Sequence, residues 1–75
     1  MEKLLKVLQE IRPDINFEKE LTLVDDGLLD SFDIVSIVSE LNDLYNISIR
    51  VTELQPENFN SAAAIHNMCI SLQKK

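Results

Sequence analysis

The residues with the clearest chemical potential are Asp30, Ser31 and Phe32, which follow the segment Asp25-Asp26-Gly27-Leu28-Leu29. Ser31 lies where a loop is predicted to become an amphipathic helix. A Ser or Asp at such a boundary commonly caps the helix, because its side chain accepts hydrogen bonds from backbone N–H groups that have no partner inside it. The other interpretation is that the hydroxyl faces solvent as an attachment point for a group added by another protein.

The sequence shows no catalytic partner for Ser31. A nucleophilic serine needs a base within hydrogen-bond reach, and the only histidine, His66, lies near the polar edge of the predicted last helix. The only cysteine, Cys69, falls on the apolar stripe of that helix, where a small buried hydrophobic residue is expected. We therefore expect that the chain is not an enzyme and that Ser31 is acted upon by others.

The acidic residues near Ser31 are expected to form a solvated charge cluster, and no metal site is predicted. Asp25, Asp26, Asp30 and Asp33 resemble part of a calcium loop, but the leucines between them do not reproduce its alternating ligands and terminal Glu. A structural zinc site is excluded because the chain has one Cys and one His.

Length and charge restrict the possible functions further. The 75 residues are expected to form one domain, residues 1–75, with a formal charge of −6 from 13 acids and 7 bases. This charge disfavours nucleic-acid binding, which depends on Lys and Arg, and favours partners with basic surfaces. No stretch approaches the roughly 20 apolar residues of a membrane span, nor is there a secretory signal. We expect a cytoplasmic monomer in a reducing compartment.

The hydrophobic pattern predicts an all-α fold with three main helices and one short one. The first helix carries an apolar stripe that ends before Pro13, and residues 31–45 form the strongest predicted helix, ending at Asn46. Pro56 begins a short helix that runs to Phe59, and Ser61 caps a last helix. Residues 13–30 are predicted to be an ordered loop whose leucines cover the bundle, and the alternating segment 47–51 is predicted to be extended loop because no partner strand exists.

Two hydrophobic residues, Phe32 and Val35, project to the polar side of the predicted helix 31–45. They stand close to Ser31 among Asp30, Asp33, Ser36 and Asp43, which suggests a contact surface for other proteins. The alternative is that Phe32 folds back onto Leu28 or Leu29.

The segment Gly27-Leu28-Leu29-Asp30-Ser31-Phe32, placed at the start of an amphipathic helix, resembles the acyl carrier protein family. The likeness extends over nearly the whole chain and includes the opening helix, the long loop, the Pro56–Phe59 helix and the closing helix. It implies a small acyl-carrier-type four-helix bundle. It also implies that a separate phosphopantetheinyl transferase attaches 4′-phosphopantetheine from coenzyme A to Ser31, with Asp30 as part of the motif. The thiol of this arm would hold an acyl or aminoacyl group as a thioester.

In this family the helix after the serine usually contacts partner enzymes, here a loading ligase and a downstream synthase or transferase. The resemblance implies contacts through Phe32, Asp33, Val35, Ser36, Glu40 and Asp43. Ser36 and Asn42 stand where acids are common in the family, which suggests a specialised stand-alone carrier. The segment Leu28–Phe32 is also similar to the D-alanyl carrier proteins of cell-wall modification, the alternative subtype. An unmodified acidic helical adaptor for basic partners is the alternative from another class.

Overall fold

In the computed structural model, which describes residues 2–74, the regular structure is entirely helical. Three long helices, one short helix and one 3-10 turn follow one another as α1 (Glu2–Ile11), α2 (Ser31–Tyr45), η1 (Val51–Glu53), α3 (Pro56–Phe59) and α4 (Ala62–Gln73). The predicted all-α four-helix class is therefore confirmed. The turn η1 was not predicted. Of the segment 47–51 predicted to be extended loop, residues 47–50 have no regular structure, but Val51 begins η1. No helix within residues 2–74 is long and apolar enough to cross a membrane.

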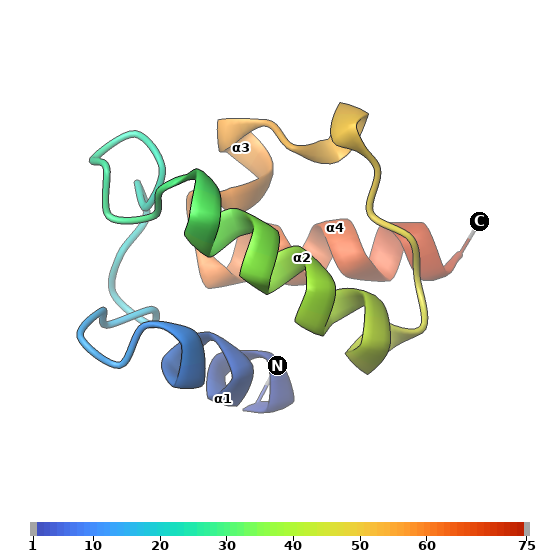
Figure 1. Cartoon of the computed structure of the whole chain (residues 1–75), viewed down its shortest axis with the longest axis horizontal. Coiled ribbons are helices and arrows are strands. Elements are labelled where there is room, and N and C mark those ends of the chain that lie inside the picture. The colour runs from blue at the N-terminus through green and yellow to red at the C-terminus, as the bar shows by residue number, and fades with distance from the viewer. Residues whose placement is uncertain (1, 75) are drawn as a thin grey trace.

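The three long helices pack around one hydrophobic core. Helix α2 runs across the molecule in contact with both α1 and α4, and α3 packs against α4 (Figure 1). Each long helix contributes side chains that are fully buried, with 0% exposure: Leu4 and Leu8, Ile37 and Leu41, and Ile65 and Cys69. These residues belong to the apolar stripes that the helical period predicts. Burial of these stripes holds α2, and with it Ser31, in a fixed place.

The long loop between α1 and α2 is ordered against the core. Ile15, Phe17, Leu23 and Leu29 are all buried, which confirms that the loop packs on the bundle. Leu21 is an exception to the predicted covering role, since 71% of it is exposed.

Asn60 fastens this loop to the corner between α3 and α4. Its backbone oxygen accepts from the Leu23 N–H at 2.8 Å, and its side-chain oxygen accepts from the N–H groups of Val24 at 3.0 Å and Asp25 at 3.1 Å. The Asn60 amide also donates to the Asp25 carboxylate at 3.1 Å. The turn then closes through Gly27, whose φ of +75° is readily adopted by glycine.

The helix ends follow from identifiable capping residues. Asn46 adopts the left-handed conformation at the end of α2, with a φ of 54°, as expected for a C-terminal cap. Pro56 occupies the first turn of α3, and the Ser61 hydroxyl accepts from Ala64 N at 3.1 Å to cap α4. These three predictions are confirmed.

Candidate functional site

Ser31 is the first residue of α2, and it is exposed. The cap of this helix is the preceding residue, because Asp30 Oδ1 accepts from Asp33 N at 2.9 Å. Asp33 returns the interaction, its Oδ2 accepting from Asp30 N at 3.4 Å, and the pair forms a capping box. Asp30 and Asp33 thus take over the capping role, and the Ser31 hydroxyl is not needed for it.

Asp33 does not face solvent, so the prediction that it lies on the exposed polar face is wrong. Only 8% of the residue is exposed, because its carboxylate turns back toward Asp30 and also accepts from Arg12 Nη1. Arg12 follows α1 directly and is far from Asp33 in sequence. An acid that is committed to these internal contacts is a poor candidate for contacting partner proteins.

Arg12 is a site residue that sequence reasoning missed. Its Nη1 also donates to the Leu28 carbonyl oxygen at 2.9 Å, and Nε and Nη2 donate to the two carboxylate oxygens of Asp14 at 3.0 and 2.9 Å. The hydrogen bonds to Asp14 and Asp33 raise the pKa of the Arg12 guanidinium, and the Arg12 hydrogen bond lowers the pKa of Asp14. Arg12 therefore stays charged and joins α1, the loop and α2 beside Ser31.

Phe32 and Val35 project into solvent, as predicted. Phe32 is 79% exposed and Val35 65% exposed, so Phe32 does not fold back onto the leucines before it. Of the polar residues expected on this surface, Glu40 and Asp43 are exposed, while Ser36 is half-buried. A shallow groove of about 560 Å³ runs along this side of α2, and α1 contributes Ile11 to its lining.

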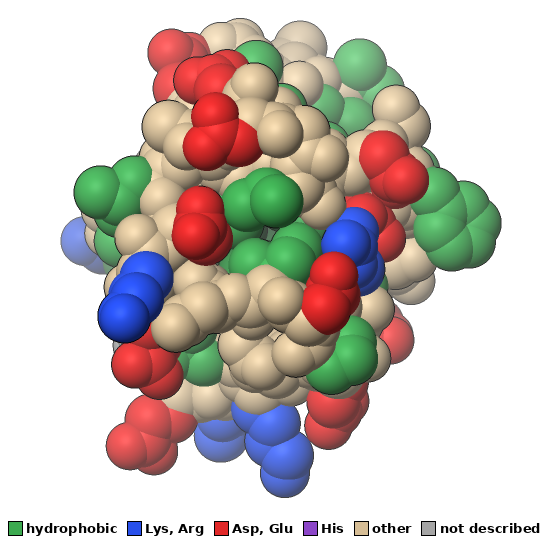
Figure 2. Space-filling model, turned by 90° about the vertical axis from the view of Figure 1, so that its left-hand side faces the viewer, with side chains coloured by type: hydrophobic (Ala, Val, Ile, Leu, Met, Phe, Trp, Pro, Cys, Tyr) green, Lys and Arg blue, Asp and Glu red, His purple; other side chains and the backbone are tan. Residues whose placement is uncertain are grey.

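The end of the molecule that carries the long loop is rich in acidic side chains. Figure 2 shows acidic groups distributed over this face, with several Lys and Arg side chains and exposed hydrophobic side chains between them. Such a surface attracts a partner with basic groups, and apolar residues in its midst can then bury area on contact.

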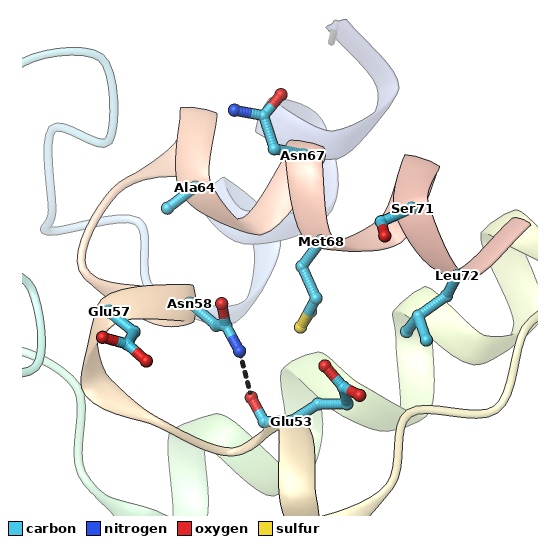
Figure 3. Close-up of a pocket in the computed structure, with 8 residues that line it drawn as sticks. All are labelled: Glu53, Glu57, Asn58, Ala64, Asn67, Met68, Ser71 and Leu72. Carbon is cyan, nitrogen blue, oxygen red and sulfur yellow. Dashed lines mark hydrogen bonds between the residues drawn. The ribbon is translucent and has the colours of Figure 1, made fainter. Parts of the chain in front are cut away.

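A second groove, of about 400 Å³, lies between η1 with α3 on one side and α4 on the other (Figure 3). Met68 points into it from α4, and Asn58 Nδ2 in its lining donates to the Glu53 carbonyl oxygen at 2.8 Å. Most of the lining is polar, from Glu53, Glu57, Asn58, Asn67 and Ser71. The groove is better suited to a small polar group than to a long alkyl chain.

The two other reactive side chains do not join Ser31. The His66 ring packs edge-on against Tyr45, with ring centroids 6.4 Å apart. Since Tyr45 ends the 15-residue helix that Ser31 begins, the two ends are about 20 Å apart at 1.5 Å per residue. Cys69 is fully buried, and burial raises its pKa to about 11. Ser31 therefore has no catalytic partner in either residue.

The family of the chain follows from comparison of its sequence with those of known proteins. No family model matches the chain. Two proteins named D-alanyl carrier protein, from Streptococcus suis strains 05ZYH33 and 98HAH33, are each 31% identical to it over 72 residues, which cover 95% of this chain and 91% of each relative. The chain belongs to the carrier protein family. The match extends over almost the whole carrier protein, and the relatives' names agree with the subtype that residues 28–32 suggested as an alternative.

Proposed function

We propose that this carrier protein bears a 4′-phosphopantetheine arm on Ser31 Oγ and carries a small aminoacyl group, D-alanine, as a thioester on it. The observation that carries the proposal is the exposed Ser31 at the first turn of α2, relieved of capping by Asp30. Membership in the carrier protein family supports the same function. In this proposal, separate enzymes catalyse the attachment of the arm and the transfer of the cargo.

The surroundings of Ser31 fit a phosphodiester. The positive end of the α2 dipole favours an anion at the first turn. One of the two nearby carboxylates, that of Asp33, is paired with Arg12, so that repulsion of the added phosphate comes mainly from the exposed Asp30 and is screened by water. When attached, the arm supplies a thiol that holds the cargo as a thioester.

The surface beside Ser31 would receive the enzymes that modify, load and unload the carrier. Phe32 and Val35 supply apolar contact area, while Glu40, Asp43 and the half-buried Ser36 supply polar contacts. Asp33 is left out of this surface because it is buried.

D-alanine is the proposed cargo for two reasons. The relatives are named D-alanyl carrier proteins. In addition, an aminoacyl thioester bears an ammonium group near neutral pH, which is compatible with a protein of formal charge −6 and with the polar groove beside α3.

The attachment is tested by incubating the protein with coenzyme A and a promiscuous phosphopantetheinyl transferase and measuring the intact mass. Wild-type protein should gain the mass of one arm, and Ser31→Ala should gain none. Ser48→Ala, a change at another exposed serine, serves as the matched control and should be modified like wild type. A folded wild-type protein that stays unmodified would favour the unmodified acidic adaptor.

The cargo is tested on the modified protein. A ligase that activates D-alanine with ATP should add one D-alanyl group, and hydroxylamine should release it, as expected for a thioester. Loading by a fatty-acyl ligase in place of the D-alanine ligase would retain the carrier function but overturn the proposed cargo.

A further inference from the structure

We infer that Arg12 is a positioning residue for the modification of Ser31: it holds the Leu28 carbonyl oxygen before the serine and the Asp33 carboxylate after it, and so presents the hydroxyl to the transferase. The inference rests on the proposed function, because it concerns the same serine. It adds a residue outside α2 whose hydrogen bonds go to Asp14, Leu28 and Asp33 and not to the Ser31 hydroxyl.

The guanidinium of Arg12 connects three parts of the chain. It donates to Asp14 just after α1, to the Leu28 carbonyl oxygen before Ser31, and to the Asp33 carboxylate after Ser31. Leu28 and Asp33 stand on opposite sides of the serine in sequence. One rigid group therefore holds both ends of the short segment that contains the hydroxyl.

Asp33 carries this restraint to the residue next to Ser31. The same oxygen, Oδ2, that accepts from Arg12 also accepts from the backbone N–H of Asp30, and the Asp30 side chain accepts in turn from Asp33 N. The hydrogen bonds thus form an unbroken series from the end of α1 to Asp30, the residue that precedes Ser31.

The chemistry of arginine matches this position. A guanidinium is planar and has five N–H donors in a fixed geometry, whereas the ammonium of lysine is a compact point charge. The guanidinium has enough donors to bind both oxygens of one carboxylate, a carbonyl oxygen and a second carboxylate at once. The three N–H donors of lysine cannot make all four of these hydrogen bonds. Arg12 also compensates the charge of Asp33, which is almost fully buried beside the position of the new phosphodiester.

A purely stabilising role of Arg12 and a positioning role predict different results. A stabilising ion pair alters the fraction of folded protein, while a positioning residue alters how the folded protein reacts. In the folded state, loss of Arg12 should lower the kcat of transfer and leave KM nearly unchanged, because Phe32, Val35, Glu40 and Asp43 still dock the transferase. Misplacement of a reacting group by about 1 Å can reduce a rate by as much as ~100-fold.

The experiment compares the kinetics of Ser31 modification in folded variants, with folding monitored by circular dichroism at the assay temperature. Arg12→Lys keeps the charge, and the double variant Arg12→Gln/Asp33→Asn removes both partners, so that no buried carboxylate is left uncompensated. Both should fold and show kcat reduced about 10-fold or more, with KM within about twofold. Arg50→Gln removes an exposed positive charge elsewhere and should react like wild type.

A kcat within twofold of wild type in both Arg12 variants would overturn the inference and leave Arg12 with a structural role only. A raised KM with unchanged kcat would also overturn it, since it would assign Arg12 to docking. Failure of the wild-type protein to be modified would instead refute the proposed function, so the two failures are distinguishable.

Discussion

The Ser31 hydroxyl is free because Asp30 and Asp33 cap the helix in its place. Asp30 accepts the hydrogen bond from the first turn of α2 and Asp33 reciprocates, so the helix begins without using the serine hydroxyl. If Ser31 were the cap itself, its oxygen would be engaged by backbone N–H groups. Because the helix begins at Ser31 and is capped by Asp30, the serine oxygen stays free. A helix that began one residue later would use Ser31 as its cap.

Phe32 and Val35 are predicted to act in partner binding and to contribute little to folding. Phe32→Ala and Val35→Ala should each raise the KM of the transferase several-fold, because both side chains are largely exposed beside Ser31. The free energy of unfolding should change by about 0.5 kcal/mol or less, as for most surface substitutions. Steady-state modification kinetics and thermal melting measure the two effects.

Ile37→Ala is the contrasting control for this pair of substitutions. Ile37 lies on the same helix with 0% exposure, and its truncation should cost about 2–5 kcal/mol of stability. A loss of that size for Phe32→Ala or Val35→Ala would show that these side chains pack in the core in solution.

Individual residues also mark the limit of what the sequence predicts about the site. Ser31, Asp30, Phe32 and Val35 were assigned correctly to their positions because local spacing and helix periodicity determine them. The burial of Asp33 was missed, since it depends on an arginine 21 residues away in sequence. Helical periodicity places Asp33 on the polar face and carries no information about that distant partner.

At the scale of elements, the long helices were predictable because their apolar residues recur at the helical period and their ends carry Pro, Asn and Ser. Residues 13–30 were predicted to form a loop that packs on the core, but the contacts that fasten this loop were not predicted. Its attachment to Asn60 joins segments about 35 residues apart, and one asparagine in a polar turn gives no sign of such a role. The turn η1 was missed because a single 3-10 turn has no periodicity.

Asn60→Ala is predicted to loosen the loop that leads into the proposed attachment site, Ser31. The substitution leaves the N–H groups of Val24 and Asp25 without their acceptor, and the cost should be about 1–2 kcal/mol for these partly exposed groups. Chemical denaturation measures the loss of stability, and amide hydrogen exchange of residues 23–25 should become faster.

Asn67→Ala removes an exposed asparagine from α4 and is the matched control for Asn60→Ala. The prediction is contradicted if the amide exchange rates of residues 23–25 are the same in wild type and in both variants. The Asn60 contacts would then not hold the loop.

At the scale of the whole molecule, the net negative charge favours the approach of partners with basic surfaces. The formal charge of −6 on a chain of 75 residues gives a field that attracts basic surfaces. The end of the molecule shown in Figure 2 presents acidic groups, with some Lys and Arg side chains among them, around exposed hydrophobic side chains. Long-range attraction can thus bring a partner to the surface where short-range apolar contacts then form.

Asp43→Lys is predicted to slow association with a basic transferase or ligase. Asp43 is exposed on α2, and reversal of its charge should reduce the association rate constant several-fold at low salt, with a smaller effect on dissociation. Stopped-flow or surface plasmon resonance measurements at increasing ionic strength should show the difference shrink as salt screens the charges.

Glu10→Lys makes the same charge change at an exposed position on α1. An equal loss from Glu10→Lys would assign the effect to net charge alone, and an effect of Asp43→Lys that is independent of salt would argue against electrostatic steering.

The burial of Cys69 has a consequence for any protein that transports an activated ester. A thioester exchanges readily with a neighbouring thiolate, and two free thiols can oxidise to a disulfide. Cys69 is the only cysteine of the chain; it lies out of reach inside the bundle and stays protonated at neutral pH, since burial raises its pKa to about 11. If Ser31 bears the proposed arm, the sulfur of Cys69 is therefore placed where it would neither take the cargo from the arm nor form a disulfide with the arm's thiol.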